Sequence, residues 1–186
     1  MTTLIAIIFA IIILIIFTII AIYNGLVRKK SMVEEAWSGI DVQLKRRYNL
    51  IPALIETVKS FTEHESEVFE NVSKYRQQCL SAGNDIPERA ESEKALASGL
   101  KSVFALAEAY PELKSNENYI QFQKELSDIE EQVQMARRYY NGSTRELNIA
   151  IDSFPSNLVA NAFNFSKREF FEVEEQHRSM PEVKFS

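Results

Sequence analysis

At 186 residues the chain has room for one domain and an accessory segment. Its 46% hydrophobic residues, with only five glycines and five prolines, argue against a disordered chain and against a loop-rich β fold. A single cysteine, Cys79, excludes an intramolecular disulfide, and the net charge of −5 is spread along the chain, which excludes a basic surface for nucleic acid.

The N-terminus carries an uncharged apolar run, "LIAIIFAIIILIIFTIIAI", from Leu4 to Ile22. About 20 apolar residues, each rising 1.5 Å, cross a hydrocarbon core of roughly 30 Å. The alternatives are a buried core helix and a cleaved signal peptide, but a signal peptide has a basic start, a shorter apolar run and a small-residue cleavage site. The start "MTT" and the end "AIYNGLV" fit that pattern poorly. We therefore predict a short extension (residues 1–3) and a transmembrane anchor (residues 4–23) that contacts the lipid bilayer.

The flanks of this run predict its orientation. Residues 24–30 form a juxtamembrane segment that ends in "RKK", and Lys45, Arg46 and Arg47 follow further along the chain. Basic residues near the end of a span stay on the cytoplasmic side. We expect a single-pass protein of the bacterial cell (inner) membrane with its C-terminal domain in the cytoplasm.

Beyond the anchor, apolar residues recur at helical steps of three and four. A first helix continues in phase past Pro52, and "TEHE" (residues 62–65) fits a capping box, which favours a break there; one helix running on to Ser81 is the alternative. Further segments are predicted at about 65–81 and 88–108. A last helix of roughly 36 residues starts at a cap on Ser115 or Asn116 and continues until Pro155.

These segments predict an all-α fold. The N-terminal transmembrane helix is followed by an antiparallel up-and-down four-helix bundle over residues 31–165, with long first and last helices. The stretch "PSNLVANAF" forms a short turn or helix, and residues 166–186 are an acidic tail whose end we expect to be mobile.

Both long helices carry charged residues beside their apolar stripes. Asp41 and Arg47 lie there on the first helix, Glu130 and Arg137 on the last. Because an isolated buried charge costs several kcal/mol, we predict pairs such as Arg47 with Glu130 or Asp41 with Arg137. This polar seam is interpreted as structural, against the alternatives of a ligand or catalytic site and a surface for a protein partner. Arg89, in the third segment, is expected to be exposed.

Catalytic patterns are missing from the sequence. His64 and His177 lie in different segments, and Glu174 with His177 gives one Glu-x-x-His pair where a di-iron bundle needs two. There is no Gly-rich phosphate loop, and Cys79 lies on an apolar stripe, as a small core residue does. We predict no enzyme, no cofactor and no metal site.

The segments "AWSxIDVQLKRRYxLIP" and "RxYNxxxRxxNxxIxxFPSN", behind a single span, resemble the LemA family over almost the whole chain. The resemblance implies a four-helix bundle behind an anchor, a break near Thr62, and no assigned reaction. Some members resemble lipoproteins with a cysteine where the span ends, and this chain has "RKK" there. The motif positions overlap the polar seam and give the candidate structural or interaction residues: Trp37, Asp41, Arg46, Arg47, Pro52, Glu130, Arg137, Tyr140, Asn141, Asn148 and Pro155.

Two functions from different classes fit this sequence. The first is a membrane-anchored interaction or scaffold protein that acts with envelope or membrane-organising proteins or by self-association as a homo-oligomer. The second is a membrane-tethered signalling protein or small-ligand sensor that uses the polar seam. A large apolar-lined cavity around Arg47 and Arg137 would favour the sensor, whereas a solid core with an exposed apolar strip would favour the scaffold.

Overall fold

A computed structural model describes residues 1–62, 64–83 and 85–171 of the chain. Within these ranges the chain is all-α, without a strand, as the apolar spacing predicts. The helices, in chain order, are α1 (Thr2–Lys59), α2 (Ser66–Ser81), α3 (Ile86–Ala109), α4 (Pro111–Lys114), α5 (Glu117–Asp152) and α6 (Ser156–Ala162).

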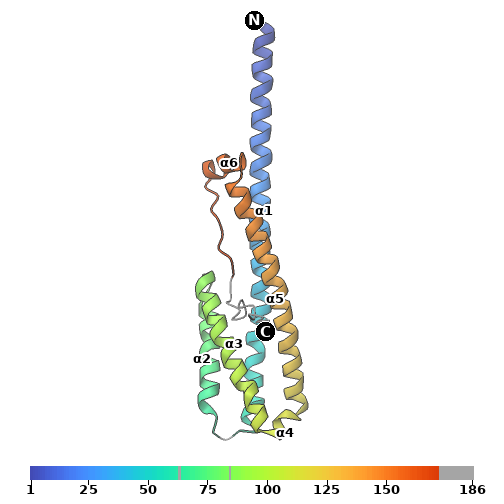
Figure 1. Ribbon diagram of the computed structural model, residues 1–186, viewed down its shortest axis with the longest axis vertical. Helices are drawn as coiled ribbons and strands as arrows, with labels where there is room; N and C mark the ends of the chain where they lie inside the picture. Colours follow the sequence, from blue (N-terminus) through green and yellow to red (C-terminus); the bar gives the residue numbers. More distant parts are fainter. Residues whose placement is uncertain (63, 84, 172–186) are drawn as a thin grey trace, which may run out of the picture. The chain divides into compact units, whose positions relative to one another are not determined.

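Helix α1 is continuous from the apolar N-terminus into the rest of the chain (Figure 1). Its first part exposes its large apolar side chains, whereas from Val33 onward the apolar stripe is buried, with only Trp37 half-buried. Pro52 lies inside the helix and does not end it, in agreement with the unbroken phase of the stripe. One helix in the described chain, α1, is long and apolar enough to cross a membrane.

The chain forms two compact units. Unit 1 contains residues 1–46 and 127–170, and unit 2 contains residues 47–126 with Phe171. The long helices α1 and α5 each contribute one part to each unit.

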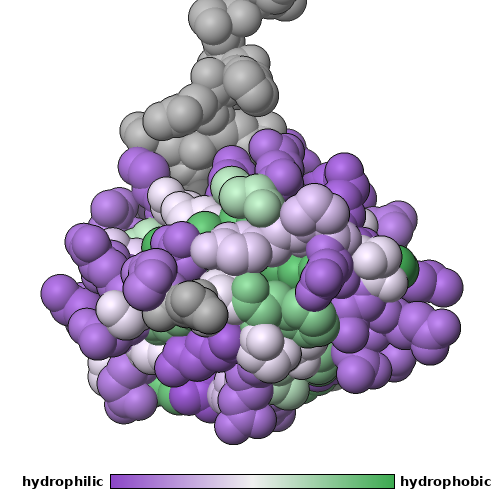
Figure 2. Space-filling view, turned by 90° about the horizontal axis from the view of Figure 1, so that it is seen from below, coloured by the Kyte–Doolittle hydropathy of each residue, from purple (hydrophilic) through white to green (hydrophobic). Residues whose placement is uncertain are grey.

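In unit 2, α2 packs closely against α3. A Cβ atom at Gly99 would lie only 3.0 Å from Val72 Cγ2 and 3.1 Å from Tyr75 Cδ2, so glycine allows the two helices to approach. Phe104 of α3 contacts the ring of Tyr119 of α5, with centroids 6.1 Å apart. The end that carries α4 is mostly hydrophilic, with the largest group of visible hydrophobic residues near its middle (Figure 2).

Unit 1 joins the first part of α1 to the second part of α5, to α6 and to a segment that we call the C-terminal strap, residues 163–170. After α6 the strap runs in an extended conformation alongside α1 and α5 (Figure 1). At its start, the rings of Phe163 and Phe165 lie 4.8 and 5.7 Å from the ring of Tyr23.

The predicted breaks are confirmed, and one predicted cap is wrong. Helix α1 ends before Thr62, and Asn116 Oδ1 caps α5 by accepting from Tyr119 N at 3.1 Å. Thr62, however, does not cap α2: its hydroxyl donates to Val58 O at 3.2 Å, because it is still within reach of the last turn of α1. Of the predicted acidic tail, residues 166–171 are described, and residues 172–186 lie outside the described ranges.

Candidate functional site: a buried polar cluster and a clamped strap

A buried ion pair lies in the core of unit 2. Arg47 of α1 and Glu93 of α3 are 5% and 4% exposed, and the Arg47 guanidinium pairs with Glu93 Oε2. The Tyr48 hydroxyl donates a hydrogen bond to the other carboxylate oxygen, Glu93 Oε1. One carboxylate of α3 thus holds two consecutive residues of α1, which fixes how the two helices face each other.

Arg89 and Cys79 extend this buried polar cluster. Arg89 lies one turn before Glu93, and its Nη1 donates to Gly83 O at 3.1 Å. Burial raises the pKa of Tyr48 to about 12, against the opposing influence of the two nearby guanidinium groups, and burial also raises the pKa of the Cys79 thiol. Both groups therefore keep their protons at neutral pH, and Cys79 has the character of a buried structural thiol rather than of a nucleophile.

Pro52 leaves a backbone carbonyl of α1 without its helical donor, and Arg76 supplies a replacement. A proline inside a helix supplies no N–H to the carbonyl four residues earlier, which here is that of Tyr48. Arg76 of α2 donates its Nε–H to Tyr48 O at 2.8 Å. Pro52 frees the Tyr48 carbonyl of α1, and the hydrogen bond from Arg76 to that carbonyl joins α1 to α2.

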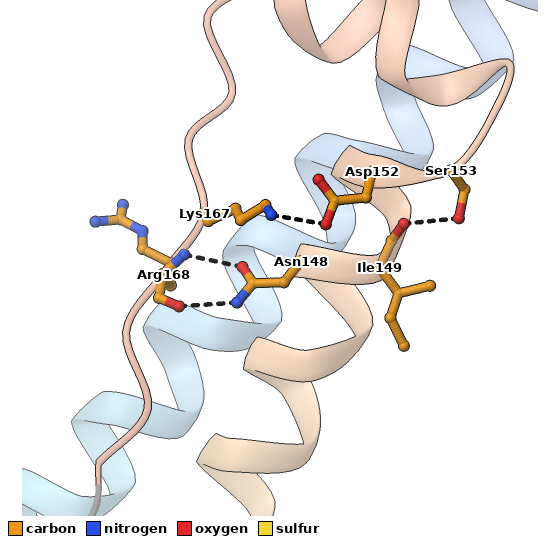
Figure 3. A network of polar contacts seen from close by, with 6 residues as sticks. All are labelled: Asn148, Ile149, Asp152, Ser153, Lys167 and Arg168. Carbon is orange, nitrogen blue, oxygen red and sulfur yellow. Dashed lines mark hydrogen bonds and ion pairs between the residues drawn. The ribbon is translucent and has the colours of Figure 1, made fainter.

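In unit 1, two of the predicted site residues hold the C-terminal strap. Tyr140 packs its ring 5.4 Å from that of Trp37 and donates its hydroxyl to Glu169 O at 2.9 Å. The Asn148 amide forms a two-bond pair with the backbone of Arg168: Nδ2 donates to the carbonyl and Oδ1 accepts from the N–H, both at 2.9 Å (Figure 3).

Ion pairs add to this attachment. Lys167 Nζ lies 2.7 Å from Asp152 Oδ2, and Arg168 lies 3.6 Å from Glu34 Oε1. Lys29 of α1 pairs with Glu146 of α5 at 3.0 Å. The two pairs of the strap, those of Lys167 and Arg168, are exposed, so they orient the strap more than they stabilise it; the pair of Lys29 joins α1 to α5.

The remaining predicted residues are dispersed over unit 1. Asp41 pairs with Lys45 at 2.7 Å, exposed Arg46 donates to Gln43 Oε1 at 3.1 Å, and exposed Glu130 accepts from Gln134 at 3.1 Å. Arg137 and Asn141 are half-buried, and exposed Pro155 precedes α6. The pairs of Arg47 with Glu130 and of Asp41 with Arg137 stay predictions.

The sequence interpretation missed Glu93, Arg89 and Arg76. The expectation that Arg89 is exposed is wrong: only 5% of it is accessible. The apolar stripe of α3 runs Leu96, Leu100, Val103, Ala107, and steps of three and four backwards from Leu96 reach Glu93 and Arg89. Extending that stripe through the charged residues would have identified both.

Among the cavities of the described residues, one in each unit has a volume of about 400 Å³. The cavity in unit 2 is lined by Phe104, Tyr119 and charged residues of α3 and α4, and that in unit 1 by Tyr23, Phe163 and charged residues of α1 and the strap. Neither is lined by Arg47 or Arg137. No cluster of three or more metal-binding side chains occurs in the described ranges. His64 is exposed, while Glu174 and His177 lie outside those ranges.

Comparison with known proteins finds that the model of the LemA family matches residues 36–185. Protein LemA of Metamycoplasma hominis is 25% identical over 155 residues, which cover 83% of this chain and 71% of that protein. Magnetosome protein MamQ of Magnetospirillum gryphiswaldense is 23% identical over 179 residues, covering 83% of this chain and 66% of the relative. Magnetosome protein MamQ 1 of Paramagnetospirillum magneticum is 23% identical over 180 residues, with the same shares.

Proposed function

Since the chain belongs to the LemA family, we propose that it is a membrane-anchored helical interaction protein. In this proposal residues 4–23 hold it in the cell membrane, and the remaining helices bind protein partners or further copies of the chain. The observation that carries the proposal is the exposed N-terminal part of α1: a helix of this apolar length needs a hydrocarbon environment to cover it.

The polar clusters support a structural and not a catalytic use of the charged residues. Arg47 and Tyr48 both bind Glu93, and Tyr140 and Asn148 bind the strap backbone. The raised pKa values of Tyr48 and Cys79 keep both side chains protonated and unreactive at neutral pH. The names of the three relatives describe no reaction, and two of them are magnetosome proteins.

We propose that the helices of unit 2 form an antiparallel four-helix bundle. The Arg47–Glu93 pair joins α1 to α3, the hydrogen bond of Arg76 joins α2 to α1, and the Phe104–Tyr119 contact joins α3 to α5. These contacts lie within one compact unit and support the arrangement that the apolar stripes predict.

A photo-crosslinking experiment in native membranes tests the interaction role. Met135 and exposed Tyr139, one turn apart on α5, offer an apolar surface, so a benzophenone amino acid would replace Tyr139. We expect membrane-fraction adducts with a defined protein or with a second copy, identified by mass spectrometry. The same amino acid at exposed Ser98 of α3 is the control. A chain found in the soluble fraction, or one that yields no protein adduct from either position, would contradict the proposal.

A ligand sensor is the weaker candidate. Its supporting observation is the pair of cavities, each large enough for a small molecule. The residues that line these two cavities include neither Arg47 nor Arg137, so the cavities give no support to a sensor that works through those two arginines.

A further inference from the structure

An uncharged, aromatic-rich segment surrounds α6. Between Asp152 and Lys167 the sequence contains no charged residue, although 25% of the chain is charged. Phe154, Leu158 and Phe163 are 80%, 60% and 54% exposed. Helix α6 already buries Val159 and Ala160 on its protein side, so these three residues form a separate outward apolar surface. Exposed apolar surface of this kind marks a binding surface for protein or membrane.

Ring contacts place this segment at the end of the predicted span. Tyr23 directly follows the apolar run that closes at Ile22, and it contacts both Phe163 and Phe165 within unit 1. In Figure 1, α6 lies beside α1. Phe163, at the end of α6, therefore lies at the depth where a bilayer that covers residues 4–22 would end.

Two separate stretches of chain show the same change of polarity at this level. Along α1, Ile22 and Tyr23 are followed by the basic residues 28–30; along the strap, Phe163 and Phe165 are followed by Lys167 and Arg168. The contact of Arg168 with Glu34 shows that both stretches run in the same direction away from the span. A gradient from aliphatic to aromatic to charged residues matches the passage from the hydrocarbon core through the interface into water.

We propose that Phe154, Leu158 and Phe163 form a second membrane contact, an interfacial platform that inserts into the same leaflet boundary through which α1 leaves the bilayer. This inference depends on the proposed membrane anchor. The platform prevents unit 1 from tilting freely about α1, because it adds a second contact beside the helix. Its partner is the lipid interface, since the apolar surface of the platform is continuous with that of the span through Tyr23.

Depth-dependent fluorescence quenching of the full chain tests this platform. The chain is reconstituted into phosphatidylcholine–phosphatidylglycerol vesicles that contain a lipid with a nitroxide near the top of its acyl chain. An environment-sensitive dye is attached to Leu158→Cys, to Thr18→Cys in the span, or to Ser38→Cys. Ser38 is exposed on α1 and lies roughly 24 Å beyond Ile22. Cys79 is buried, and the chain without an added cysteine serves as the labelling blank.

The expected pattern is a blue-shifted, quenched dye at residues 158 and 18 and a water-exposed, unquenched dye at residue 38. Phe154→Ser should weaken quenching at residue 158, whereas Tyr139→Ser, another exposed aromatic residue of unit 1, should not. A quenched dye at 18 with an unquenched dye at 158 would overturn the platform and leave the anchor intact. A blue-shifted dye at 158 that lipid does not quench would point to a protein partner instead and also overturn it. An unquenched dye at 18 would overturn the anchor itself.

Discussion

Arg46 and Arg47 are adjacent in the sequence and have opposite environments. Successive residues of a helix point about 100° apart, so Arg46 faces water and donates to Gln43, while Arg47 points into the core of unit 2 toward Glu93. A buried ion pair adds little net stability compared with apolar residues of the same size, but the loss of one partner leaves an uncompensated charge. The pair therefore specifies how α1 and α3 pack.

Replacing Arg47 by alanine should destabilise the protein by about 3–5 kcal/mol, because Glu93 would keep a buried charge without its ion-pair partner. Arg46→Ala, the matched exposed control, should change the free energy of unfolding by less than about 0.5 kcal/mol. The combined Arg47→Met and Glu93→Leu exchange should cost less than Arg47→Ala alone, since it removes both charges. Urea denaturation of the detergent-solubilised chains, followed by circular dichroism, measures all three. Equal stability of Arg47→Ala and Arg46→Ala would show that the pair is not structural.

Tyr48 should make the protein sensitive to alkaline pH. Its pKa rises from 10.0 to about 12 on folding, so the folded state keeps the proton that the unfolded chain releases above pH 10. The contribution of Tyr48 to the free energy of unfolding is fully present below pH 10. It is lost as the pH rises toward 12, with a slope of up to about 1.4 kcal/mol per pH unit. Tyr48→Phe should flatten this part of the profile, although it costs about 1–3 kcal/mol at neutral pH by removing a donor from buried Glu93. Denaturation midpoints of both chains from about pH 8 to pH 12 test this, and parallel profiles would contradict it.

The sequence identified Arg47 as buried because it lies in the apolar stripe of α1, but it did not identify the pairing with Glu93. Charged residues alternate in sign along "ERAESEK", a pattern typical of a solvated helix face. Helical spacing specifies which residues share a face, and it does not specify which helix packs against that face. Spacing alone can therefore mark Glu93 as buried, but its pairing with Arg47 follows only from the contacts of α3.

At the level of the helices, Pro52 and Arg76 explain how α1 continues through a proline. The Tyr48 carbonyl has lost its helical N–H donor, and the Arg76 side chain of α2 replaces it. Proline thus gives α1 a backbone acceptor that faces a neighbouring helix.

A double-mutant cycle tests this replacement. Arg76→Ala should cost about 1–3 kcal/mol in the natural chain, because a half-buried carbonyl loses its donor. In a Pro52→Ala background the alanine N–H restores the helical bond, so the same Arg76→Ala exchange should cost clearly less. Thermal denaturation of the four chains gives the coupling energy, and strictly additive effects would exclude the proposed link.

The strap is the element that sequence patterns predicted least well. Asn148 and Tyr140 were identified as candidate site residues, but as members of a seam between helices and not as a clamp on residues 168 and 169. An extended segment held by side-chain-to-backbone hydrogen bonds has no periodic pattern of apolar residues. Its own sequence therefore does not predict that it packs along the helices. The break before α5 was predicted because Asn116 caps that helix, whereas the break after α1 was predicted from a capping box that Thr62 does not form.

Asn148→Asp should release the strap. A carboxylate keeps the acceptor for Arg168 N but replaces the amide donor with an oxygen that repels Arg168 O. Trypsin should then cleave after Lys167 or Arg168 several-fold faster, because cleavage follows the population of the open segment. Asn161→Asp, at an exposed position of α6, is the charge-matched control. Equal cleavage rates for the two variants would show that the strap is held by other contacts.

At the level of the whole chain, the continuity of α1 limits how far the residues after the span can move from the membrane. The same helix that crosses the membrane in our proposal supplies Trp37 to unit 1 and Arg47 to unit 2, without a linker between anchor and domain. In that proposal the residues after the span stay close to the membrane on one side, and the proposed partners are expected on that side.

The side is expected to be the cytoplasm, because Arg28, Lys29 and Lys30 directly follow the span and basic residues resist translocation. Protease added to intact spheroplasts should therefore leave the domain uncut and digest it only after lysis, as seen on a blot with a C-terminal tag. Replacing the three basic residues by glutamine and adding three lysines after Met1 should weaken or reverse this protection, because the charge difference across the span sets orientation. A periplasmic reporter protein, cut in both samples, confirms that the protease is active. Digestion of the unmodified chain in intact spheroplasts would place the domain, the strap and the interfacial platform on the outer side, and the partners would then have to be sought in the envelope.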